Sequence, residues 1–228
     1  MALALGERLG MAGPTTITLL LPLCRQQGIT QPLIRALSLC HHPRARDQLL
    51  AWLPQAGESG PAVLEALACW GNQIDLAIIE QALQAPGRAF RLAGLELLTF
   101  RNRSLPAHHL LELTAPLLKD LRAEVVIATL RLLQRRSEVT VLSAIGSCIE
   151  LDALPGVAEM AIQCLGCIGT EESCQQLLAQ ADRLFNTRLE QPLRRQLEAQ
   201  VPYKHLVIQT LEVLNSSFPS QSSQVDGM

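Results

Sequence analysis

A repeated apolar unit is the feature that most limits how this chain can fold. In its clearest copy, Met160 to Thr170, apolar and small residues at helical spacing end at Gly169, and a second apolar segment follows. Gly169 predicts a left-handed residue that ends the first helix, and Thr170 is a typical N-cap for the next one. The unit therefore predicts two helices joined by a tight turn.

The same frame recurs along the chain. The segment 64–72 superposes on it without gaps, and this alignment predicts Asn72 as the N-cap of the following helix. Looser copies surround the remaining anchor leucines, which recur every 28 to 35 residues: Leu37, Leu67, Leu95, Leu130 and Leu165. Such spacings suit two short helices with their turns.

These repeats predict an all-α fold, because no stretch alternates with the period of two that marks a half-buried strand. One helix pair cannot bury its apolar stripe alone, so neighbouring pairs must stack into a continuous core. We expect an α-solenoid of about five HEAT-like helix pairs from about Thr30 to Phe185, with capping helices at 14–27, 187–200 and 203–214. The prediction is a single domain over residues 1–214 and a disordered Ser/Gln-rich tail over 215–228, which is poor in apolar residues.

The best-defined unit resembles the HEAT-like repeat of phycobilisome lyases and related bacterial scaffold proteins. Cys164 and Cys174 stand where that repeat usually has Ala, and Thr170 where it usually has Asp. The residues that match are Ala161, Leu165, Gly166, Ile168, Gly169, Leu177 and Leu178. The resemblance implies a HEAT-like stack, and members of that family serve as bilin lyase or isomerase subunits, pigment-complex disassembly factors or adaptors. The matching residues are packing residues, so they imply no particular activity.

Candidate metal and catalytic residues are few. Cys164 and Cys167 form a C-x-x-C pair that could indicate a zinc or redox site, but a structural zinc site needs four ligands, and the repeat frame assigns both residues to core packing. The histidine pairs 41–42 and 108–109 are adjacent, so neither presents two ligands on one helix face, and we expect exposed turns. The sequence also lacks the common nucleophile, nucleotide and zinc-protease motifs. We therefore predict no metal, no catalytic residue and no bound cofactor.

Two further features concern burial and location. Trp52 and Trp70 are the only tryptophans. The repeat frame favours a core position for Trp70, and Trp52, late in a second helix, either packs in the core or reaches the surface; we expect the core for both. The apolar run 16–23 is far shorter than the ~20 residues that span a bilayer. We expect no membrane span, a cytoplasmic location and free thiols at the seven cysteines.

Charge is distributed unevenly along the chain. Residues 86–136 hold nine Arg or Lys and four Asp or Glu, whereas residues 137–182 hold no basic residue and seven acidic ones. Six arginines fall at the turns within helix pairs, which a repeat stack would align along one edge. We call this predicted set the basic rim: Arg44, Arg46, Arg101, Arg103, Arg135 and Arg136. The rim is either an ordinary solvated edge or a docking edge for an acidic partner.

Our leading hypothesis is a non-enzymatic adaptor or assembly factor that binds an acidic protein along a concave face or the basic rim. The alternative is a bilin lyase or isomerase-type subunit or another phycobilisome-associated factor, suggested by the resemblance. A HEAT-like DNA glycosylase needs a basic groove with aromatic side chains. The net charge of −2 and the 3% aromatic content oppose nucleic-acid binding.

Overall fold

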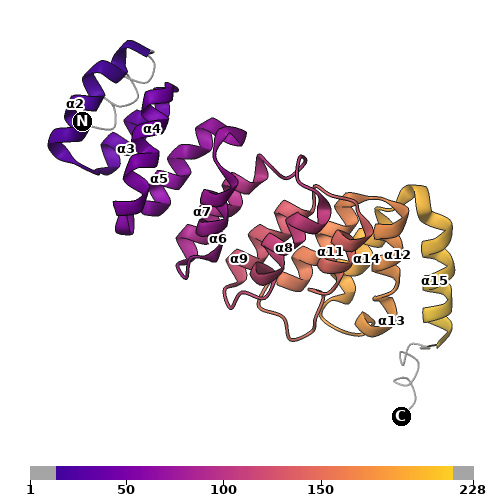
Figure 1. Cartoon of the computed structure of the whole chain (residues 1–228). Coiled ribbons are helices and arrows are strands. Elements are labelled where there is room, and N and C mark those ends of the chain that lie inside the picture. The colour runs from indigo at the N-terminus through magenta and orange to yellow at the C-terminus, as the bar shows by residue number, and fades with distance from the viewer. Residues whose placement is uncertain (1–13, 218–228) are drawn as a thin grey trace. The chain divides into compact units, whose positions relative to one another are not determined.

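A computed structural model describes residues 14–217, with side chains from residue 15 to residue 210, and every regular element in that range is a helix (Figure 1). The all-α prediction is therefore confirmed for these residues. None of the helices within them is long and apolar enough to cross a membrane. The α-helices are α2 (Ile17–Gln27), α3 (Gln31–Leu39), α4 (Pro43–Trp52), α5 (Gly60–Leu67), α6 (Leu76–Gln84), α7 (Arg88–Thr99), α8 (Ala107–Leu118), α9 (Ala123–Leu133), α10 (Val139–Gly146), α11 (Val157–Ile168), α12 (Glu171–Leu178), α13 (Ala181–Leu184), α14 (Glu190–Glu198) and α15 (Lys204–Ser217).

Helices occupy the positions expected from about Thr30 to Phe185, and the helices of three expected pairs, α3–α4, α9–α10 and α11–α12, are in contact. The solenoid arrangement of five pairs stays a prediction. The predicted helix at 14–27 is formed by a short 3₁₀ turn followed by α2, and α14 and α15 occupy the two predicted C-terminal helices. Most of the tail predicted to be disordered lies outside the described residues, which end with α15 at Ser217.

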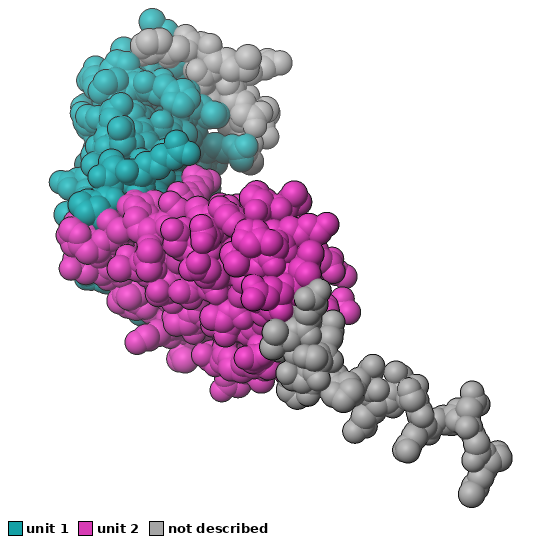
Figure 2. Space-filling view, turned by 90° about the vertical axis from the view of Figure 1, so that its right-hand side faces the viewer, with its two compact units in different colours: residues 1–106 teal, residues 107–228 magenta. Residues whose placement is uncertain are grey.

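The chain divides into two compact units, residues 1–106 and 107–228 (Figure 2). In the first unit, α3, α5 and α7 contact one another in succession, while α2, α4 and α6 pack against them. Stacked helix pairs contact their neighbours alone and can divide in this way without forming separate domains. The single-domain prediction for residues 1–214 therefore stays a prediction.

The second unit contains two rows of helices. One row consists of α9, α11 and α14, in which α11 contacts both neighbours, and the other consists of α8, α10 and α12. The rows contact each other through α8 and α9, α10 and α11, and α12 and α14. Each helix therefore packs against elements about one repeat away in sequence.

Long-range hydrogen bonds follow the same spacing. In the first unit, the Arg46 guanidinium donates to the Gln73 side chain over 3.0 Å, across 27 residues. In the second, the Gln200 amide donates to the Gly166 carbonyl over 2.9 Å, across 34 residues. Both bonds therefore join segments about one repeat length apart in sequence.

The turn at Gly169 was predicted correctly, and the turn after Gly71 was not. Gly169 is left-handed, with φ 68° and ψ 25°, and Thr170 caps α12 by accepting a hydrogen bond from the Ser173 N–H. Asn72 does not cap α6, because the chain passes through the 3₁₀ segment Ala68–Gln73 before that helix begins. The cap is Asp75, whose carboxylate accepts from the Ala77 N–H over 3.1 Å.

The core contains the anchor leucines and both tryptophans. All five anchor leucines are buried, as are Trp52 and Trp70, so the core predictions for both tryptophans are confirmed. Buried Leu is a large apolar contribution, about 1.5–3 kcal/mol per side chain. The apolar stripe of each repeat therefore accounts for the packing of the helices.

Candidate functional site

A polar groove lies between α9 and α11 in the second unit. Its volume is about 460 Å³, and no Asp or Glu side chain lines it. We call this feature the α9–α11 groove and define it by its lining residues: Arg131, Gln134, Arg135, Met160, Gln163 and Cys167. Two guanidinium groups without a lining carboxylate make the groove electropositive.

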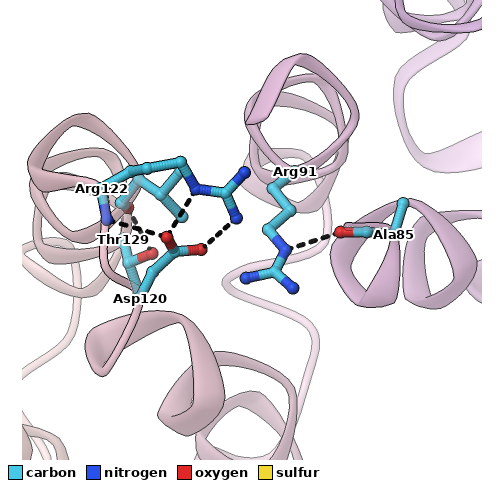
Figure 3. A network of polar contacts seen from close by, with 6 residues as sticks. Ala85, Arg91, Asp120, Arg122 and Thr129 are labelled. Atoms are coloured by element: carbon cyan, nitrogen blue, oxygen red, sulfur yellow. Dashed lines mark hydrogen bonds and ion pairs between the residues drawn. The ribbon is translucent and has the colours of Figure 1, made fainter. Parts of the chain in front are cut away.

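Asp120 and Arg122 form an ion pair at the start of α9 (Figure 3). Asp120, whose side chain is 1% exposed, accepts hydrogen bonds from the Arg122 backbone N–H at 2.9 Å and from its guanidinium at 2.7 and 2.8 Å. Further along, the buried Thr129 hydroxyl donates to the Val125 carbonyl over 2.8 Å within the same helix. These contacts fix the backbone that carries the arginines of the groove.

The other wall is set by the ends and packing of α11. Gly156 at its start and Gly169 at its end both adopt left-handed conformations. The Cys164 thiol lies 3.5 Å from the Leu130 carbonyl of α9, in a sulfur–oxygen contact between the two helices. This close contact beneath the groove holds its walls together.

Arg131 and Arg135 lie at the C-terminal end of α9 and are separated by four residues. Arg131 lies in the last turn of α9 and Arg135 in the turn just after the helix ends at Leu133, so both cations lie near the end of the helix dipole with which they interact favourably. Both residues are exposed, and neither forms an ion pair with the described residues. By contrast, Arg183 and Arg188 pair with Glu150 and Glu159, respectively. The two groove arginines can therefore bind a carboxylate from outside the chain.

The C-x-x-C pair divides between the core and the groove. Cys164 is fully buried, as predicted, and burial raises the pKa of its thiol to about 12. Cys167 was predicted to pack in the core, and that prediction is wrong, because its side chain is exposed and lines the groove. Three residues advance a helix by about 300°, and this step carries Cys167 past the edge of the buried face.

Two of the four rim residues of the first unit contact the Gln73–Ile74 turn. Arg46 bonds to Gln73, and the Arg101 guanidinium donates to the Ile74 carbonyl over 2.7 Å. The structure thus brings Arg46 and Arg101 to the same turn, where both stabilise the first unit. Arg44 and Arg103 are exposed. Elsewhere in this unit, the half-buried Arg91 donates to the Ala85 carbonyl over 2.7 Å (Figure 3).

The rim residues of the second unit differ from each other. Arg135 lines the α9–α11 groove, whereas Arg136 forms an ion pair with Glu138 and its side chain is 10% exposed. The hydrogen bond from Arg136 lowers the pKa of the Glu138 carboxyl group. Arg135 is therefore the rim residue of this pair that is accessible to a partner.

The histidines have no metal-binding arrangement around them. His41 is exposed with a φ of 45°, and the His42 ring accepts a hydrogen bond from the Arg44 N–H at the start of α4. Among residues 14–217, no group of three or more His, Cys, Asp or Glu side chains is placed to hold a metal ion.

The first unit contains an apolar pocket of about 420 Å³, lined in part by Leu53, Leu64, Ile78 and Phe90. The Phe90 ring packs directly on Gly60, where an added Cβ would approach a ring carbon to 2.5 Å. Gln81 is the polar side chain in the lining. This pocket has no charged group with which to recognise a partner.

Sequence reasoning found Arg135 and missed the rest of the groove. The short spacing of Arg131 and Arg135 was a usable signal, because both lie at the C-terminal end of α9 and line the same groove. Gln163 and Cys167 lie on another helix, and no local pattern assigns them to the same site. No protein-family model matches the chain, and comparisons with curated proteins and with solved structures also return no match.

Proposed function

We propose that this chain is a non-enzymatic adaptor or assembly factor, an α-solenoid of HEAT-like helix pairs that binds an acidic segment of another protein. The observation that carries the proposal is the α9–α11 groove, where Arg131 and Arg135 are exposed without a carboxylate partner among the described residues. Guanidinium groups bind carboxylates through paired hydrogen bonds. The groove therefore suits a Glu or Asp side chain.

The other side chains of the groove favour a peptide over a simple ion. Gln134 and Gln163 provide amide groups that can donate to and accept from a peptide backbone. Met160 adds a flexible apolar surface beside them. An extended acidic segment would satisfy the arginines with its side chains and the glutamines with its backbone.

Cys164 and Cys24 are unsuited to nucleophilic catalysis. Burial raises the pKa of Cys164 to about 12 and that of Cys24 to about 11, so both remain protonated near neutral pH. A protonated, buried thiol is a poor nucleophile. The proposal includes a cytoplasmic location, where such thiols stay reduced.

Binding can be tested with a fluorescein-labelled hexaglutamate peptide, measured by anisotropy. We expect the wild-type protein to bind and the affinity to fall as salt rises. Replacing Arg131 and Arg135 by Glu should weaken binding by roughly 30-fold, since losing two charged contacts of about 1 kcal/mol each amounts to about 2 kcal/mol.

The matched control reverses two exposed arginines outside the groove, Arg25 and Arg195. This double variant has the same net charge as the groove variant and should bind like wild type. Equal loss in both variants would mean that binding depends on overall charge, and the groove proposal would then be rejected. A pull-down from the native host with the same three proteins extends the comparison to natural partners.

A second candidate is a bilin-binding subunit. The two propionate groups of a bilin could also bind Arg131 and Arg135, but the tetrapyrrole needs apolar walls, and the groove is mainly polar. Visible absorbance in the pulled-down material, lost in the groove variant, would favour this candidate. A colourless acidic protein in that material would favour the adaptor.

A further inference from the structure

The second unit carries an exposed apolar patch where α8 leads into α9 and α10 leads into α11. Leu121 is 91% exposed, and Leu151 and Leu154 are 43% and 36% exposed. Leu121 and Leu154 both border one surface hollow. We call this hollow, together with these three leucines, the loop patch. Leu121 and Leu154 therefore belong to one exposed surface, and exposed apolar surfaces of this kind mark interaction sites more often than isolated leucines do.

The hollow provides a receptor for an apolar side chain. Its volume is about 550 Å³, and Leu118, Val126, Leu154 and Val157 contribute apolar surface to it. Leu121 also borders the hollow, yet nearly all of its surface faces solvent. The loop patch therefore combines a projecting leucine with a cavity that is large enough for one.

The loop patch also carries both signs of charge. Lys119 and Asp152 line the hollow, are exposed, and form no ion pair with the described residues. The other two acids in the lining are engaged, Asp120 with Arg122 and Glu150 with Arg183. One unpaired cation and one unpaired anion therefore lie on the same surface.

A surface with a projection and a cavity, and with one charge of each sign, is complementary to itself. In a two-fold symmetric contact, the same patch of each copy faces the other. If one residue of the first copy contacts a second residue of its partner, the reverse contact is also formed. We propose that the loop patch binds a second copy of this chain, with Leu121 of each copy in the hollow of the other. Lys119 of each copy then lies opposite Asp152 of the second copy. An acidic or a basic partner would be attracted by one of these charges and repelled by the other.

The size of the patch sets the expected strength. Fourteen residues line the hollow, whereas a standard stable interface takes about 20–30 residues from each side. We therefore expect weak dimerisation, with a Kd in the micromolar range. This association is independent of the α9–α11 groove, so Arg131→Glu should not change it.

The test is sedimentation velocity of the full chain from about 1 µM to about 1 mM, which spans weak affinities. Wild type should shift from monomer to dimer. Leu121→Asp should raise the Kd at least about tenfold, because the buried leucine contact is lost. Val139→Asp is the matched control, since Val139 is 59% exposed on the same unit but does not line the hollow, and it should dimerise like wild type.

Charge exchange tests the arrangement of the two copies. Lys119→Asp and Asp152→Lys should each weaken the dimer, because like charges then face each other. The double variant restores opposite charges across the contact and should dimerise like wild type. A monomer at every concentration overturns the proposal, as does a dimer that is unaffected by Leu121→Asp. Failure of the double variant to recover overturns the proposed two-fold pairing.

Discussion

Replacing Gly166 with Ala should destabilise the second unit, although alanine favours a helix. Gly166 lies within α11, where α14 approaches closely. A Cβ added at this position would lie 2.1 Å from the Gln196 side-chain oxygen and 2.8 Å from the Gln196 Cβ. The amide can rotate away, but the Cβ cannot move unless the backbone of α14 also moves. The Gln200 hydrogen bond to the Gly166 carbonyl would then lengthen from 2.9 Å.

The expected change in the free energy of unfolding is the sum of two destabilising effects and one stabilising effect. Overpacking a tight contact costs about 1–3 kcal/mol. A weakened hydrogen bond from Gln200 adds about 0.5–1.5 kcal/mol. The higher helix propensity of Ala returns about 1 kcal/mol. We therefore expect the free energy of unfolding to fall by about 0.5–3.5 kcal/mol for Gly166→Ala.

Urea unfolding followed by far-UV circular dichroism measures this change, and two backgrounds locate its cause. In Gln196→Gly the opposing Cβ is absent, so Gly166→Ala should become neutral or stabilising. In Gln196→Ala the Cβ remains, so most of the loss should persist. Gly146→Ala is the control, because its Cβ would approach the flexible end of Gln176 to 3.1 Å, and stability should not fall. Equal losses in the Gln196→Gly and wild-type backgrounds would refute the reasoning.

Three further predictions concern thiols, pH and helix capping. At neutral pH, N-ethylmaleimide should modify the exposed Cys167 and spare the buried Cys164 in the folded protein, as peptide mass spectrometry can show; equal labelling would contradict the burial. The hydrogen bond from Arg194 lowers the pKa of Glu190 below 4.5, so the stabilisation is present above pH 4.5 and is lost as pH falls through the folded-state pKa. Arg194→Met should therefore reduce the acid sensitivity of urea unfolding, and an unchanged pH profile would rule out this contribution. Thr170→Ala removes the side chain that caps α12 and should lower the free energy of unfolding by about 1 kcal/mol in the same assay; no loss would mean that the cap is dispensable.

Much of the local structure was predictable because its causes lie within a few residues. Leu130 and Leu165 recur at the same point of successive repeats, and both are buried. Gly169 and Thr170 end one helix and begin the next through their own backbone and side-chain chemistry. The prediction failed at Asn72. Gly71 and Asn72 both lie within the 3₁₀ segment Ala68–Gln73, and the next helix begins only after Asp75, which caps it.

The candidate site was less predictable because it is assembled from two helices. Arg131 and Arg135 lie close together in sequence at the C-terminal end of α9, but Gln163 and Cys167 come from α11. Cys167 was assigned to the core because its position in the repeat frame usually packs. Its exposure depends on which face of α11 packs against the neighbouring helices, and the repeat frame does not specify the edges of that face.

The sequence by itself determined the all-helical character and the turn at Gly169 and Thr170, because periodicity and capping act over one or two helical turns. The tertiary structure decided which arginines are available to a partner. Arg101 and Arg136 look equivalent to Arg135 in sequence, yet Arg101 bonds to the Ile74 carbonyl and Arg136 to Glu138. Whether a side chain finds a partner depends on distances between packed elements, and these distances arise when the helices assemble.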